Sequence, residues 1–414
     1  MTRGYIFHVD GDAFFAQCEI ARYPHLRGRP VVVGQERGIA TAFTYEAKAL
    51  GIVRGMPLWK VKKYYPEVII LPSHFELYKE YSKRLIAIVS RYLDQVESYS
   101  IDECFGFARG DRFASWDEVK VFTQKIKQNL QNELGITFSF GVARTKVLAK
   151  VASKLQKPNG CTILRDEYVN DVLSKLSIDA VWGIGRSTAF QLRLDRITNA
   201  LEFIQTPKAI IEKKYAKPVV ALWYELSGIQ IFSLERQTRI PSSLQSTKSF
   251  MSLENNYETI VAHILKNLEI VCGRARKNNV VTNTVVIELK TKTFEYHTKE
   301  ITLPFFTNND LSVVPFLEKN IRECFQNGVR YRSTGVTLLS LMPSDRVTYD
   351  LFNVQKNHFS INKIGTTIDQ ITKKFGRGSI VSLGSLALYK TNKSKKTFNN
   401  KVEKLPFPFL GEVI

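Results

Sequence analysis

Residues 5–15 read Tyr-Ile-Phe-His-Val-Asp-Gly-Asp-Ala-Phe-Phe, and this stretch decides the fold. Its apolar first half predicts a strand of a buried sheet, with Asp10 at the strand end. A similar pattern at residues 96–107 places the adjacent acids Asp102 and Glu103 at a strand edge or turn. Carboxylates at the rim of an apolar sheet are unfavourable unless a positive charge compensates them. A divalent cation is the expected compensation, because hard oxygen ligands suit Mg²⁺. The alternative is that Asp102 and Glu103 only shape a β-turn.

Composition limits the class of protein. The 414 residues suggest about three domains, and a net charge of +20 predicts a polyanionic partner, with nucleic acid first. A cationic membrane-surface protein is the alternative, although no long basic amphipathic helix stands out. No stretch approaches the ~20 apolar residues of a membrane span, and Asp10 and Asp12 interrupt the apolar run that a signal peptide needs. Five scattered cysteines without a CxxC pair indicate a reducing, cytoplasmic setting and argue against disulfides or zinc.

The first 160 or so residues alternate helical and strand patterns, which predicts an α+β domain with a mixed sheet. Ser73 with Glu76, and Ser115 with Glu118, predict capping boxes at two helix starts. Further along, Phe138–Val142 predicts a strand and residues 146–155 a helix. Lys157-Pro158-Asn159-Gly160 closes that helix with turn chemistry.

The remaining chain reads as a helical segment, a linker and a second α+β unit. Residues 165–232 look helical and contain a Gly-x-Gly turn at Gly183 and Gly185. The polar composition of residues 233–247 predicts the linker. Residues 285–292 predict a strand with one apolar face and one face carrying Lys290 and Lys292, which suits a DNA backbone. A simple solvated face is the alternative.

Four short motifs of this sequence together resemble those of a known protein family. Residues 10–19 (DGDAFFAQCE), 45–48 (YEAK), 100–103 (SIDE) and 157–160 (KPNG) follow one another in the order and rough spacing of the Y-family translesion DNA polymerases. The chain resembles their bacterial DinB/UmuC-type branch from residue 5 to about residue 388. The resemblance implies a right-hand architecture with an added little-finger domain. The domains implied are a palm (1–12 and 72–164), fingers (13–71), thumb (165–232), linker (233–247), little finger (248–343), and a C-terminal extension with a basic tail (344–414).

The resemblance also assigns roles around the acids. Asp10, Asp102, Glu103 and the backbone carbonyl of Gly11 are implied to hold two Mg²⁺ ions, the arrangement used in nucleotidyl transfer. Asp12 is not implied as a ligand and is expected to shape the loop. Phe15 resembles the steric gate that excludes a ribose 2′-hydroxyl, beside a buried Phe14 that is also implied in nucleotide binding. The alternative for Phe15 is a core aromatic.

Other residues resemble contacts to the two substrates. Tyr45, Lys48 and Lys157 resemble a triphosphate clamp, in which Lys48 departs from the more common Arg and so loses bidentate geometry. A helix-surface position is the alternative for Tyr45 and Lys48. The Gly183 and Gly185 turn, followed by Arg186, resembles a helix-hairpin-helix that offers backbone amides to a DNA phosphate, unless it is only a turn.

Two C-terminal segments resemble interaction sequences. Residues 348–352, Thr348-Tyr349-Asp350-Leu351-Phe352, resemble the peptide by which bacterial polymerases bind a sliding clamp, with Thr348 in place of the usual Gln. An ordinary buried segment is the alternative. Residues 405–410 are a second candidate for partner docking. Residues 368–379 resemble the extension of the UmuC-type branch, to which no chemistry is assigned.

The sequence therefore predicts a monomeric, template-directed DNA polymerase that acts on primer-template DNA and deoxynucleoside triphosphates and tolerates damaged templates, as in an SOS response. One rival is a non-catalytic DNA-binding scaffold of the same fold, against which the complete set of acids argues. The other rival is a different two-metal enzyme on a similar palm, such as a nucleotidyl cyclase, which leaves the basic second half of the chain unexplained.

Overall fold

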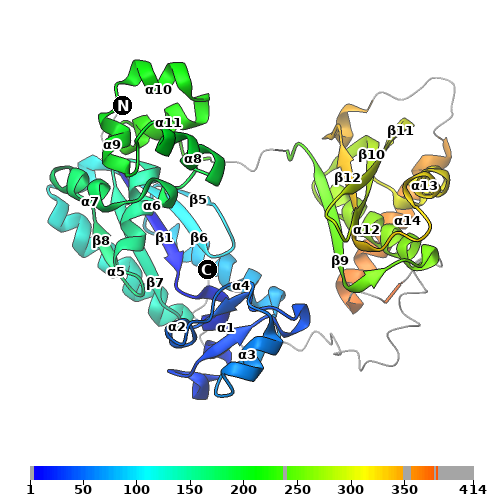
Figure 1. Cartoon of the computed structure of the whole chain (residues 1–414), viewed down its shortest axis with the longest axis horizontal. Coiled ribbons are helices and arrows are strands. Elements are labelled where there is room, and N and C mark those ends of the chain that lie inside the picture. Colours follow the sequence, from blue (N-terminus) through cyan, green and yellow to red (C-terminus); the bar gives the residue numbers. More distant parts are fainter. Residues whose placement is uncertain (1–3, 236–239, 348–355, 377–378, 381–414) are drawn as a thin grey trace. The chain divides into compact units, whose positions relative to one another are not determined.

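The computed structural model describes residues 4–235, 240–347, 356–376 and 379–380 (Figure 1). The chain divides into two compact units at the boundary between Gln237 and Thr238, which falls in the stretch that the composition marks as a linker. Each unit has its own sheet and its own buried core.

A five-stranded mixed sheet organises the first unit. Its strand order is β5-β6-β1-β7-β8, in which only β7 and β8 pair in parallel. The mixed sheet predicted for the first 160 residues is therefore confirmed. The strands are β1 (Gly4–Gly11), β5 (Gln95–Ser98), β6 (Glu103–Arg109), β7 (Phe138–Ala143) and β8 (Cys161–Ile163).

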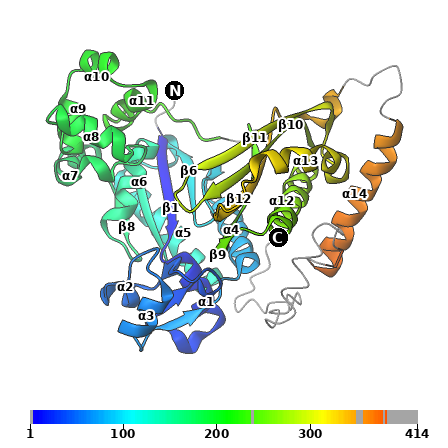
Figure 2. The ribbon, with the colours of Figure 1, turned by 45° about the vertical axis from the view of Figure 1, so that its right-hand side comes forward.

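Alternation along β1 divides the residues between two cores. Phe7 and Val9 join the core beneath α4 (Phe75–Val89) and α5 (Trp116–Leu134). Ile6 points to the other face, where α6 (Lys146–Leu155) lies along β1 and β7. Figure 2 shows β1 running between these layers. The even-numbered residues of β1, which include His8 and Asp10, thus face α6.

Helix α6 packs unusually closely on the sheet at Gly141. A Cβ atom added there would lie 2.1 Å from the carbonyl oxygen of Ala149 and 2.2 Å from the backbone nitrogen of Ser153. Any other residue would push the helix away from β7. The glycine therefore sets the distance between α6 and β7, the strand that pairs with β1.

A smaller three-stranded sheet lies between β1 and α4 in the sequence. Its order is β3-β2-β4, formed by Ala42–Phe43, Val31–Val33 and Ile69–Leu71. Three helices accompany it, namely α1 (Phe14–Arg22), α2 (Tyr45–Ala49) and α3 (Leu58–Tyr64). Apolar residues of this sheet and of α2 and α3 form a separate small core, so the segment packs largely within itself.

The two predicted helix caps have different outcomes. Ser115 caps α5 by accepting a hydrogen bond from the Glu118 backbone, and Gly135 ends the helix in the left-handed conformation, so this start and stop are confirmed. The carboxylate of Glu118 accepts from the Ala114 backbone rather than from Ser115. The cap at Ser73 is wrong, because α4 begins after His74 and has no side-chain cap. The Ser73 amide instead donates to Glu36, from the preceding sheet region.

Five helices follow, as predicted for residues 165–232. They are α7 (Val169–Lys175), α8 (Arg186–Leu194), α9 (Ala200–Gln205), α10 (Lys208–Lys214) and α11 (Lys217–Leu226). The fully buried Glu225 joins them to α6, because its carboxylate accepts hydrogen bonds from the backbone of Val147, Ile231 and Phe232.

The second unit is a four-stranded antiparallel sheet with the order β11-β10-β12-β9. Helices α12 (Tyr257–Lys277) and α13 (Asp310–Cys324) pack on it, and α14 (Lys356–Phe375) contacts both helices. The strands are β9 (Leu244–Glu254), β10 (Val280–Thr291), β11 (Tyr296–Thr307) and β12 (Tyr331–Leu339), with the short β13 (Met342–Pro343) paired to β10. Strand β9 starts inside the predicted 233–247 linker.

The predicted alternation of β10 is confirmed. Val285, Ile287 and Leu289 are fully buried, while Lys290 is only partly covered. Lys292 is exposed and lies one residue past the strand end. The residues that share the apolar face thus follow the pattern read from the sequence.

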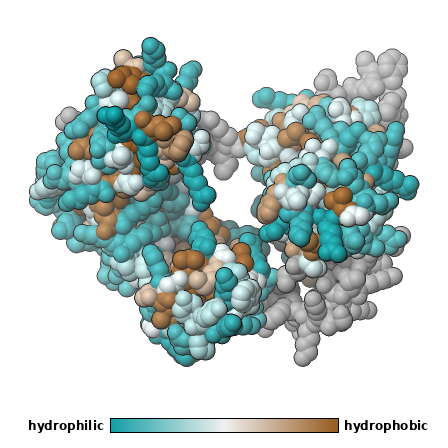
Figure 3. All heavy atoms as spheres, viewed as in Figure 1, coloured by the Kyte–Doolittle hydropathy of each residue, from teal (hydrophilic) through white to brown (hydrophobic). Residues whose placement is uncertain are grey.

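Hydrophobic residues occur in small groups among hydrophilic ones on the face of each unit drawn in Figure 3. Among the described helices, none combines the length and apolar character needed to cross a membrane. All five cysteines carry free thiols.

Candidate active site

Sheet register brings two of the predicted acids together. Asp10 on β1 lies directly opposite Glu103 on β6, and the Gly11 amide donates to the Asp102 carbonyl over 2.8 Å. Ligand atoms of Asp10, Glu103 and His8 all lie within 4.8 Å of one another. The carboxylate of Asp102 lies outside this group and accepts a hydrogen bond from the Ser100 hydroxyl. Asp10 and Glu103 therefore form the centre of the cluster, and Asp102 is its backbone neighbour.

Two lysines compensate the acids. Lys150 Nζ lies 2.7 Å from Glu103 Oε2, and Lys157 Nζ lies 2.5 Å from Asp10 Oδ1. Burial by itself would raise the pKa of Glu103, but the hydrogen bonds from His8 and Lys150 outweigh burial and lower that pKa to about 2. For Asp10, burial raises the pKa despite the opposing charge of Lys157. Ammonium groups thus stand where the sequence predicts metal cations.

The donor set fits hard divalent cations. Asp10 and Glu103 offer carboxylate oxygens, which Mg²⁺ prefers. Both side chains are partly exposed, and Asp10 lines the adjoining pocket. A cation at this point would take over the compensation now supplied by Lys150 and Lys157. The site therefore suits Mg²⁺ on the chemistry of its donors.

His8 is a hydrogen-bonded core residue, as its position on β1 predicts. The side chain is fully buried, with Nδ1 2.8 Å from the Ser153 hydroxyl and Nε2 3.0 Å from Glu103 Oε2. Burial lowers the pKa of its imidazole, while the hydrogen bond to Glu103 acts in the opposite direction. His8 thus ties Glu103 to helix α6.

One open pocket of about 710 Å³ collects most of the predicted site residues. Its wall includes the acids Asp10 and Asp102 and the aromatic side chain of Phe15. The predicted nucleotide-binding residues Phe14, Tyr45, Lys48 and Lys157 and the backbone of Gly11 line the same pocket. Residues from distant parts of the sequence therefore share one cavity.

The two adjacent phenylalanines have different environments. Phe14 is 3% exposed, as expected for the buried member of the pair. Phe15 is partly exposed at the pocket and stacks on Tyr78 with ring centroids 4.3 Å apart. The interpretation of Phe15 as a purely core aromatic is therefore not supported by its position.

Helix α2 carries the next pair of predicted contacts. Lys48 Nζ lies 5.8 Å from the centre of the Tyr45 ring, and Lys48 is exposed. Burial, together with the charges of Asp12 and Asp10, raises the pKa of Tyr45 to about 12. The phenol therefore stays protonated at neutral pH and can donate a hydrogen bond to an anion.

Asp12 shapes the loop beside the site. Its carboxylate accepts hydrogen bonds of 2.7 Å from the Ser139 hydroxyl and the Asn159 backbone amide. Asn159 has a positive φ of 57° in the turn that follows Lys157. Asp12 thus fixes the turn that presents Lys157 to Asp10, the structural role expected for it.

The predicted DNA contacts of the first unit do not line this pocket. Gly183 has a φ of +91°, and Gly185 forms the N-cap of α8 with open space around its Cα. Arg186, the first residue of that helix, is exposed. In the second unit, Lys290 Nζ donates to the Tyr296 hydroxyl over 2.8 Å and Lys292 is exposed. The predicted clamp peptide, residues 348–352, and the segment 405–410 lie outside the described residues.

Several residues at the site were not predicted. Lys150 binds Glu103, and Arg37 and Arg54 line the pocket. Lys146 and Lys150 are four residues apart on α6, and both are nearly buried. The sequence did contain a signal for the two lysines, since they are spaced by one turn on an otherwise apolar helix face. A lysine on such a face is buried and needs an acidic partner. Arg37 ends a short 3-10 helix and Arg54 lies in a turn, and the sequence around them carries no such pattern.

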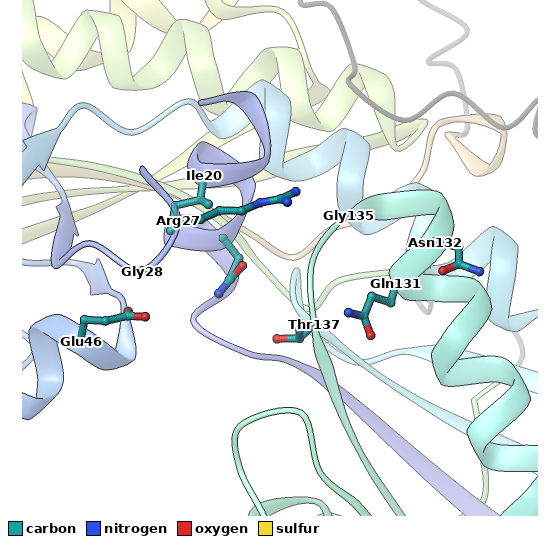
Figure 4. Close-up of a pocket in the computed structure, with 9 residues that line it drawn as sticks. Ile20, Arg27, Gly28, Glu46, Gln131, Asn132, Gly135 and Thr137 are labelled. Carbon is teal, nitrogen blue, oxygen red and sulfur yellow. The ribbon is translucent and has the colours of Figure 1, made fainter. Parts of the chain in front are cut away.

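A second pocket, of about 670 Å³, lies on the other side of α1 and holds none of the predicted site residues (Figure 4). Glu46 stands on one side of it, opposite Gln131 and Thr137. Its walls are open and mix polar with apolar groups, and no cluster of metal-binding side chains is found among its described residues.

Comparisons with known proteins agree with this geometry. The impB/mucB/samB family matches residues 9–154, and the C-terminal domain of the same family matches residues 241–351. "DNA polymerase IV" of Desulfatibacillum aliphaticivorans is 28% identical over 388 residues, covering 92% of this chain and 96% of that protein. "DNA polymerase IV 1" of Bacillus subtilis strain 168 is 28% identical over 409 residues, covering 96% of each.

Solved structures show the same fold. The "Y-family DNA polymerase chimera Dbh-Dpo4(243-245)-Dbh" superposes with a TM-score of 0.70 at 24% identity, covering 82% of this chain and 99% of that one. The "Insertion ternary complex of Dbh DNA polymerase" has a TM-score of 0.55 at the same identity and coverage. The predicted right-hand fold with an added little-finger domain is thus confirmed. The two family matches together span more than half of the sequence, and the chain belongs to the impB/mucB/samB family, as a DinB-type member of the Y-family DNA polymerases.

Proposed function

We propose that this chain is a template-directed DNA polymerase that adds deoxynucleotides to a primer 3′-hydroxyl and copies past damaged template bases. The observation that carries the proposal is the meeting of Asp10 and Glu103 at the edge of a pocket that also contains Asp102, Phe15 and Lys157. A nucleotidyl transfer site needs acids for metal ions, cations for a triphosphate and a wall for the sugar, and this pocket has all three.

The acids have a direct role in this proposal. Asp10, Glu103, Asp102 and the Gly11 carbonyl would hold two Mg²⁺ ions between the primer end and the triphosphate. Bound there, the ions supply Lewis-acid chemistry that makes the 3′-hydroxyl more acidic and neutralises the departing pyrophosphate. His8 and Lys150 keep the Glu103 carboxylate ionised and oriented toward Asp10.

The basic and aromatic side chains bind the incoming nucleotide. Lys157, which pairs with Asp10 here, would turn to the triphosphate, with Tyr45 and Lys48 as further donors. The Phe15 ring would lie beneath the sugar and exclude a 2′-hydroxyl by contact. These residues place the reacting atoms and exclude ribonucleotides.

The duplex and the partners complete the proposal. Gly183, Gly185 and Arg186 would bind a DNA phosphate at the N-terminus of α8, and Lys290 and Lys292 would add backbone contacts. None of these contacts reads bases, so binding is independent of sequence and sensitive to salt. We also propose that the protein acts as a cytoplasmic monomer, with residues 348–352 as its clamp-binding peptide.

Primer extension tests the function. Purified protein with a primer-template and deoxynucleotides should extend the primer only when Mg²⁺ is present. The double variant Asp102→Ala/Glu103→Ala should lose extension by a factor of at least about 10³, because electrostatic stabilisation of the transition state is removed. Asp111→Ala is the matched control, since Asp111 is an exposed acid of the same unit, and its activity should be unchanged.

Three outcomes separate the candidate functions. Magnesium-dependent extension that the double variant abolishes supports the polymerase. Retardation of DNA without extension under any condition supports the scaffold. Conversion of a nucleoside triphosphate to a cyclic product without a primer supports the cyclase.

A further inference from the structure

The ring of Phe15 rests on an aromatic side chain that a buried carboxylate holds in place. Phe15 and Tyr78 stack with their planes only 12° apart. The Tyr78 hydroxyl donates to Oε1 of Glu19 over 2.5 Å. Glu19 belongs to the same helix as Phe15 and lies one turn further along it. The three side chains thus close a loop of contacts between α1 and α4.

A third ring restricts sideways movement of the stack. Phe75, the first residue of α4, meets the edge of Phe15 and of Tyr78 with centroid distances of 5.8 and 5.7 Å. The guanidinium of Arg37 covers Phe75 at 5.3 Å from the ring centre. Because Phe75 occupies the space beside the Phe15 ring, the height of that ring in the pocket depends on Tyr78, on which it stacks.

The buried position of the Glu19 carboxylate is unfavourable for stability. The Glu19 side chain is fully buried, and His74 Nδ1 lies 2.8 Å from the same oxygen that accepts from Tyr78. The other oxygen, Oε2, has no hydrogen-bond partner among the described residues. Burial of a carboxylate with one oxygen unpaired opposes folding, and an apolar side chain of similar volume usually packs at least as well. A buried carboxylate that holds the ring beneath Phe15 is therefore a candidate for positioning that side chain.

We propose that Glu19 is a positioning residue for the sugar gate. By holding the Tyr78 hydroxyl, it fixes the height of the Phe15 ring and so sets how strongly the site rejects a ribonucleotide. An apolar wall discriminates against one hydroxyl only modestly, and its effect depends on close contact. A functional side chain has to stay within about 0.5 Å of its working position, which requires support from behind. This inference rests on the proposed function, because it assumes that Phe15 contacts the sugar.

The test measures sugar discrimination. Single-nucleotide insertion gives kcat/KM for a deoxynucleotide and for the matching ribonucleotide, and their ratio is compared between variants. Tyr78→Phe keeps the stacked ring but removes the hydroxyl, and Glu19→Gln keeps the shape but removes the charge. Each should lower the ratio about tenfold, as expected when one hydrogen bond to a charged group is lost or weakened. Most of the change should come from a higher kcat/KM for the ribonucleotide.

Two further variants make the outcome decisive. Tyr92→Phe removes another phenol of the same core, one that accepts a hydrogen bond from Asn129 and does not line the pocket. Its ratio should equal that of the wild type. Phe15→Ala should abolish discrimination if Phe15 is the gate at all.

The results then fall into separate classes. A lowered ratio in Tyr78→Phe with an unchanged ratio in Tyr92→Phe supports the proposal. An unchanged ratio in Tyr78→Phe, together with a collapsed ratio in Phe15→Ala, overturns the proposal and leaves the gate intact. An unchanged ratio in Phe15→Ala refutes the gate and this inference with it. Since Tyr78→Phe retains the ring, the test stands even if Glu19→Gln fails to fold.

Discussion

Replacement of Lys150 by methionine should make the stability of the first unit depend on pH in a new way. Lys150 Nζ lies 2.7 Å from Glu103 Oε2, and both side chains are mostly buried, at 9% and 14% exposed. Methionine fills similar space without the charge. The variant therefore removes the ion pair while keeping most of the packing against Tyr99 and Trp182.

The magnitude follows from the pKa of Glu103. Its value falls from 4.5 to about 2 in the folded protein, and a shift of this size is worth about 3 kcal/mol of stability. Part of the shift comes from His8, which the variant keeps, and solvent at the pocket rim screens the ion pair. We therefore expect a loss of about 2 kcal/mol at pH 7 as an upper value. Because the folded pKa is lowered, this stabilisation is present above the unfolded value near 4.5. It is lost as the pH falls toward 2, and the difference between wild type and variant should shrink over that range.

Urea unfolding of the metal-free protein at pH 7 and pH 3 measures the loss of stability in the variant and its decrease at low pH. All four tryptophans (Trp59, Trp116, Trp182 and Trp223) lie in the first unit, so their fluorescence follows that unit alone. Lys125→Met is the control, since Lys125 is an exposed lysine on α5 of the same unit. A difference at pH 7 below about 0.5 kcal/mol, the usual scale of a surface change, would refute the reasoning. So would a difference that is no smaller at pH 3 than at pH 7.

Three more predictions concern other parts of the chain. Ser115→Ala should lower the unfolding free energy of the first unit by about 1 kcal/mol through loss of the α5 cap, seen in the same urea assay, whereas Ser73→Ala should have no capping effect. Arg276→Met should weaken the attachment of α14 to its unit, because Arg276 binds Asp369 on α14 at 2.6 Å and Asp310 at 3.1 Å. Amide exchange should become faster in residues 364–376 alone, and unchanged exchange there would contradict the prediction. Arg186→Ala should reduce the slope of log affinity for duplex DNA against log salt by about 1, and an unchanged slope would exclude a phosphate contact at this residue.

Much of the fold was predictable because local and tertiary preferences agree. The apolar run that ends at Asp10 forms β1, and residues 146–155 form α6 with the predicted bounds. Leu77, Tyr81 and Leu85 are buried on one face of α4, as their spacing indicates. The cap at Ser73 failed because its amide makes a tertiary hydrogen bond to Glu36, which no local pattern reveals.

The candidate site was predictable in its ligands but not in its supports. Strand ends and turn motifs mark Asp10, Glu103 and Lys157, and the sheet register brings them together. Glu19 and Lys150 have no such mark. Their roles arise from contacts with Tyr78 and Glu103, which are distant in sequence and become neighbours only after folding.

The close packing at Gly141 limits which parts of this sequence can change during evolution. With no room for even one methyl group between β7 and α6, a change at this position would shift Lys150 away from Glu103 and Ser153 away from His8. Inherited variation is therefore better tolerated on the part of the pocket wall formed by the short helix α2, where Lys48 is exposed. Substrate preference can drift there across generations while the acids remain in place.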